Sequence, residues 1–125
     1  MTVTAPKSGK VGTVSPASRL RQWAEQAPDG VALREKYLGL WREITFADYW
    51  DSVQTVAHAF LSLGIEPGDR IAVHSENRPE WVFADVAAVA VRAASMGLYP
   101  TNPAPEVQYL LADSGARILI AEDQE

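Results

Sequence analysis

The residues that could carry chemistry gather in one polar stretch, His74-Ser75-Glu76-Asn77-Arg78. This stretch directly follows the apolar run Ile71-Ala72-Val73 and precedes Pro79, so we expect a buried strand, a loop and then the start of a helix. Open α/β sheets bind ligands at the carboxyl ends of their strands, and the amides at a helix N-terminus attract anions. The loop is therefore the best candidate for a ligand site within the chain.

A structural interpretation of the same loop is favoured over the ligand site. Asn77 can cap a helix that begins at Arg78-Pro79, while Glu76 and Arg78 are solvated or paired and His74 is an ordinary loop residue. No glycine-rich phosphate-binding sequence accompanies the loop. We therefore predict a capped joint between a strand and a helix.

The other candidate groups form no catalytic constellation. Asp85 lies in an apolar stretch, where a hydrogen bond or an ion pair is favoured over catalysis. Ser75 and Ser114 lack the glycine-flanked sequence of a nucleophile elbow, and His58 flanks an apolar stripe and is expected to be structural. We predict no catalytic residue, no cofactor-binding residue and no metal ligand in this chain.

Composition excludes several classes of function. The 125 residues are 47% hydrophobic and 22% charged, as in an ordinary globular protein, and the net charge of -5 without a basic cluster argues against nucleic-acid binding. The absence of cysteine excludes disulfides and thiolate metal sites and is compatible with a reducing cytoplasm. The most apolar run, residues 82–91, contains Asp85 and is too short to span a bilayer.

The elements that must position these residues alternate between helix and strand. Parallel strands joined by right-handed crossover helices predict a layered α/β sheet, preceded here by a β-hairpin. Residues 1–14 are expected to be a disordered leader and residues 15–125 one α/β portion. The expected elements are a helix from Ser15-Pro16 to 27, a hairpin over 31–44 with its turn at Leu38-Gly39, a helix capped by Thr45 and ending at Gly64, a strand over 71–73, a helix over 78–96 stopped by Gly97, a strand at Leu98-Tyr99, a helix over 106–113 and a strand over 117–121. The four tryptophans, Trp23, Trp41, Trp50 and Trp81, are expected to pack mostly in the core.

The stretch from Gly68 to Trp81 resembles a segment near the N-terminus of AMP-forming fatty acyl-CoA synthetases, in the adenylate-forming enzyme superfamily. Thr45-Phe46-Ala47-Asp48-Tyr49 resembles the start of a helix in the same family. Residues 96–117 are similar to its Tyr-Pro-Thr turn, followed by a helix that ends in Asp-Ser-Gly-Ala-Arg. The likeness runs from Ser18 to the last residue and favours the long-chain branch.

The resemblance implies the N-terminal portion of an incomplete AMP-binding domain. In the full-length enzyme, ATP and Mg²⁺ would activate a fatty acid as acyl-AMP, and coenzyme A would then take the acyl group. The family's phosphate loop, adenine and magnesium segment and lid lysine have no counterpart here. The segment alone is therefore expected to bind none of these cofactors and to be inactive.

The resemblance also implies partners and a location. Fatty acid, ATP and coenzyme A are the partners expected of the full-length enzyme, in the cytoplasm, with peripheral membrane contact left open. No nucleic acid and no transmembrane segment are expected, and the oligomeric state is not predicted. The alternative is a non-catalytic α/β module that binds a protein partner or a small ligand.

Overall fold

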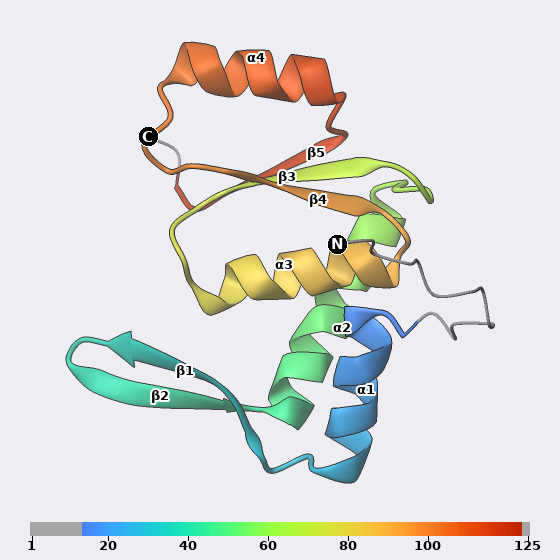
Figure 1. The fold of residues 1–125 in the computed structure, drawn as a ribbon, viewed down its shortest axis with the longest axis vertical. Helices are drawn as coiled ribbons and strands as arrows, with labels where there is room; N and C mark the ends of the chain where they lie inside the picture. Colours follow the sequence, from blue (N-terminus) through green and yellow to red (C-terminus); the bar gives the residue numbers. More distant parts are fainter. Residues whose placement is uncertain (1–13, 124–125) are drawn as a thin grey trace, which may run out of the picture.

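The computed structural model describes residues 14–123, so the expected leader lies outside the described residues except for its last residue. The chain forms an α/β fold with a separate N-terminal hairpin, as predicted (Figure 1). Its elements are α1 (Pro16–Gln26), β1 (Val31–Tyr37), β2 (Leu40–Thr45), α2 (Phe46–Ser62), β3 (Arg70–His74), α3 (Pro79–Ala90), β4 (Ala94–Leu98), α4 (Ala104–Ser114) and β5 (Ile118–Ala121).

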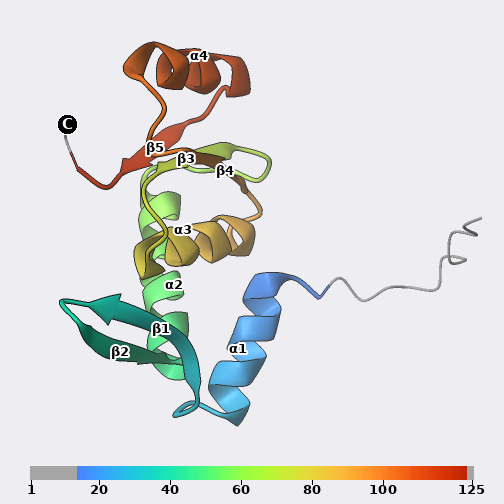
Figure 2. The same cartoon turned by 60° about the vertical axis from the view of Figure 1, so that its left-hand side comes forward.

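A parallel three-stranded sheet has the order β4-β3-β5, with β3 in the centre. Val73 of β3 is paired with Gly97 on one side and with Ile120 on the other. Helix α3 connects β3 to β4 along one face, and α4 connects β4 to β5 along the opposite face (Figures 1 and 2). The loops that leave the adjacent strands β3 and β4 therefore lead to opposite faces of the sheet. In open α/β sheets this arrangement marks the place where ligands bind.

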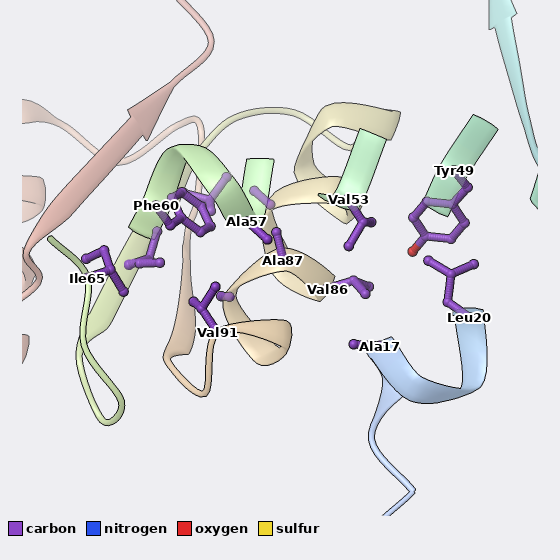
Figure 3. Close-up of a cluster of buried hydrophobic side chains, with 14 residues drawn as sticks. Ala17, Leu20, Tyr49, Val53, Ala57, Phe60, Ile65, Val86, Ala87 and Val91 are labelled. Atoms are coloured by element: carbon purple, nitrogen blue, oxygen red, sulfur yellow. The ribbon is translucent and has the colours of Figure 1, made fainter. Parts of the chain in front are cut away.

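The main core lies on the α3 side of the sheet. Helix α2 carries Tyr49, Val53, Ala57 and Phe60 at helical spacing, and this stripe is buried. Figure 3 shows the stripe beside side chains of α3 and, at one end, of α1. Small residues let α3 approach its neighbours closely; they are Ala84, Ala87 and Ala88, all at most 3% exposed.

The β1–β2 hairpin extends away from the sheet, next to the N-terminal end of α2 (Figures 1 and 2). Its turn residues Leu38 and Gly39 both have positive φ, 48° and 82°, as in the tight two-residue turns that match the twist of a hairpin. The side chain of Thr45 then accepts a hydrogen bond from the backbone N–H of Asp48 and caps α2. Both features agree with the sequence prediction.

The boundary between α3 and β4 differs from the prediction. Helix α3 ends at Ala90 instead of 96, and β4 covers Ala94–Leu98 instead of Leu98-Tyr99. Arg92 takes a left-handed conformation, with φ of 63°, and turns the chain so that the next residues pair with β3. Small helix-compatible residues thus become a strand, because sheet pairing outweighs their local preference.

Gly97 lies inside β4 and does not stop a helix. A Cβ atom at this position would lie 3.1 Å from Cζ2 of Trp81, so the glycine allows the indole ring to pack directly on the strand. The prediction of a helix stop was therefore wrong, and the physical role of this glycine is close packing between α3 and β4.

The tryptophans are less buried than expected. Trp50 and Trp81 are half-buried against the core, but Trp23 and Trp41 are exposed. Trp23 stacks on Phe46 with a distance of 5.6 Å between ring centroids, so one face of its ring is covered while the other faces solvent. Trp41 lies near the tip of the hairpin, where the described core does not reach. His58 is exposed on α2.

Candidate functional site

The candidate loop runs from the end of β3 to the start of α3, as predicted. His74 is the last residue of β3, and its Nε2 atom lies 3.0 Å from the backbone oxygen of Tyr99, just after β4. Because a carbonyl oxygen only accepts, Nε2 donates this hydrogen bond. The histidine therefore ties together the carboxyl ends of two neighbouring strands.

Three donors of the loop converge on one carboxylate, that of Glu122, directly after β5. Glu122 accepts hydrogen bonds from the side chain of Ser75 at 3.2 Å and from the backbone N–H of Glu76 at 2.9 Å. Nη1 of Arg78 donates to the second carboxylate oxygen at 2.7 Å. An anion of the chain itself thus occupies the place where an anionic ligand was considered.

The charges in this cluster stabilise each other. The backbone N–H of Glu76, aided by Arg78 and Ser75, holds the pKa of the Glu122 carboxyl below its ordinary value. The pKa of Arg78 is raised by Glu80, which accepts from its Nε at 3.0 Å, and by Glu122. Arg78 therefore stays charged and is shared between two carboxylates, which agrees with the prediction that it is paired.

The prediction that Asn77 caps α3 was wrong. The N-cap residue is Arg78, and it makes no side-chain capping bond. Pro79 occupies the first turn of the helix and forces the residue before it into an extended conformation, here φ -141° and ψ 163°. The N-cap residue has an extended conformation and flanks the first helical residue. Because Pro79 imposes this conformation on Arg78, the N-cap is Arg78 and not Asn77.

Two hollows border the loop. The larger one, of about 650 Å³, lies between the hairpin, from Leu33 to Lys36 and at Trp41, and the start of α3. It has an apolar floor that includes Leu33, Pro79 and Trp81, and a polar rim with Arg34 and Arg78. The smaller one, of about 230 Å³, lies between the loop and the end of β5 and includes Ser75 and Glu122. Arg78 lines both hollows.

Asp85 stands apart from this loop. Its carboxylate accepts a hydrogen bond from the hydroxyl of Ser95 on β4, which is the structural role that the sequence favoured. Burial, together with the nearby charge of Asp85, raises the pKa of Tyr49 to about 12. Asp85 of α3 is therefore bonded to β4, and its charge acts on Tyr49 of α2.

The described part of the chain contains no group of three or more acidic or histidine side chains placed to hold a metal ion. Among residues 14–123, no helix is both long enough and apolar enough to cross a membrane. The polar side chains of the loop are bonded within the chain, His74 to the backbone oxygen of Tyr99 and both Ser75 and Arg78 to Glu122. Its chemistry is that of a structural tie between strands.

Sequence reasoning missed Glu122, the residue on which the loop depends. An acidic residue just after an apolar run is a common pattern, so the only available signal was its place at the end of a strand. Its partners lie 44 to 47 positions earlier in the chain. They become neighbours only because β5 pairs with β3 in one particular register.

Comparison with known proteins identifies the family of this fold. The AMP-binding enzyme family matches residues 20–125. A long-chain-fatty-acid–CoA ligase, FadD15 of Mycobacterium bovis, is 36% identical over 95 residues, which are 76% of this chain and 16% of that protein. The chain thus spans about a sixth of the length of this relative.

Two further relatives extend the comparison. The structure of the N-terminal domain of FACL13 from Mycobacterium tuberculosis matches with a TM-score of 0.77 and 28% identity, over 84% of this chain and 26% of the other. An uncharacterized protein of Mycobacterium tuberculosis, Rv1549, is 36% identical over 97 residues, which are 78% of this chain and 54% of that protein. Together, the family match, the relatives and the fold show that this chain belongs to the AMP-binding enzymes, with long-chain-fatty-acid–CoA ligases among its relatives.

Proposed function

We propose that these residues form the N-terminal segment of an ATP-dependent long-chain fatty acid–CoA ligase, and that their role there is structural. The full-length enzyme would join a fatty acid to coenzyme A through an acyl adenylate, with ATP and Mg²⁺. The observation that carries the proposal is the Glu122 cluster: the donors of Ser75, Glu76 and Arg78 at the strand ends are bonded within the chain. These internal bonds favour a structural role for the loop over the binding of a substrate.

Fatty acid, ATP, Mg²⁺ and coenzyme A are accordingly assigned to the complete enzyme and not to this segment. The cysteine-free sequence supports a cytoplasmic location. The alternative function, a non-catalytic module that binds a small ligand, has one supporting observation, the groove of about 650 Å³ between the hairpin and α3.

The proposal is tested by an assay of the chain alone. With ATP, Mg²⁺, palmitate and coenzyme A, we expect no release of pyrophosphate above the rate without protein, because the polar groups of the loop are bonded to Glu122 and no described group of acidic or histidine side chains is placed to hold a metal ion. FadD15, assayed in parallel, serves as the positive control. Reproducible pyrophosphate release that depends on palmitate would contradict the structural role.

A further inference from the structure

We draw no further inference here: the strongest candidate, the groove of about 650 Å³ between the β1–β2 hairpin and the start of α3, lies in a chain that spans about a sixth of its relative FadD15, and nothing in the structure shows what covers it.

Discussion

The two faces of the three-stranded sheet are packed very differently. Toward α3, Ile71 and Val73 of the central strand are at most 1% exposed and belong to the main core. Toward α4, Leu119 of β5 remains 42% exposed, and α4 itself has no buried residue. Each helix is a crossover between two parallel strands of this sheet, α3 between β3 and β4 and α4 between β4 and β5, so the presence of a crossover helix alone does not explain the difference.

The difference comes from what lies behind each helix. Helix α3 is packed between the sheet and α2, with α1 covering one end, so that apolar side chains are enclosed from both sides (Figure 3). Helix α4 lies alone over its face of the sheet (Figures 1 and 2). A single amphipathic helix leaves its outer surface in solvent and encloses little. Within the described residues, the α3 face is therefore enclosed on both sides, whereas the α4 face is covered by a single helix.

Substitution on the two faces gives the largest expected contrast. Ile71→Ala removes a side chain that is 0% exposed, and we expect it to lower the free energy of unfolding by about 2–5 kcal/mol. Leu119→Ala on the α4 face is expected to cost less than about 1 kcal/mol, because this side chain keeps much of its contact with water. Urea unfolding of both variants measures the contrast; similar losses would show that the two faces are equally packed.

The tie at the carboxyl ends of β3 and β5 gives a smaller, pH-dependent effect. The folded state lowers the pKa of Glu122 below its ordinary value of 4.5, so its contribution to stability is present above about pH 4.5 and is lost as the pH falls through the folded pKa. We expect Glu122→Gln to reduce the fall in melting temperature that the unchanged chain shows between about pH 5 and pH 3.

The matched control for this prediction is Glu76→Gln, which changes an exposed carboxylate in the same loop but leaves its backbone N–H bonded to Glu122. The control should follow the pH dependence of the unchanged chain. If Glu122→Gln and Glu76→Gln behave identically, the Glu122 cluster does not stabilise the joint between strands.

The sequence predicted those features that depend on near neighbours. The cap at Ser15, the turn at Leu38-Gly39 and the stripe of α2 are each set by residues within a few positions, and all three are confirmed. The extent of β4 was mispredicted, because pairing with β3 converts a helix-compatible segment into a strand. The role of Glu122 was not predicted either, because it also depends on strand pairing, here on the register between β3 and β5.

Within the five residues of the candidate loop, one sequence prediction is confirmed and another is wrong. Its position between a buried strand and a helix followed from local pattern, and the structure confirms it. The capping residue was wrong by one position because of the constraint that Pro79 imposes on Arg78. Whether the loop binds a ligand or closes on itself depended on a carboxylate from a distant part of the chain, which no local pattern identifies.

The central claim, that this segment is a scaffold of a fatty acid–CoA ligase, is tested most directly by a chimera. The matched 95 residues of FadD15 are replaced by those of this chain, and synthesis of palmitoyl-CoA is measured. A misplaced active site can lose on the order of a hundredfold in rate, so a scaffold that fits should keep the chimera within about a hundredfold of FadD15. A folded chimera with a lower rate than this would contradict the claim.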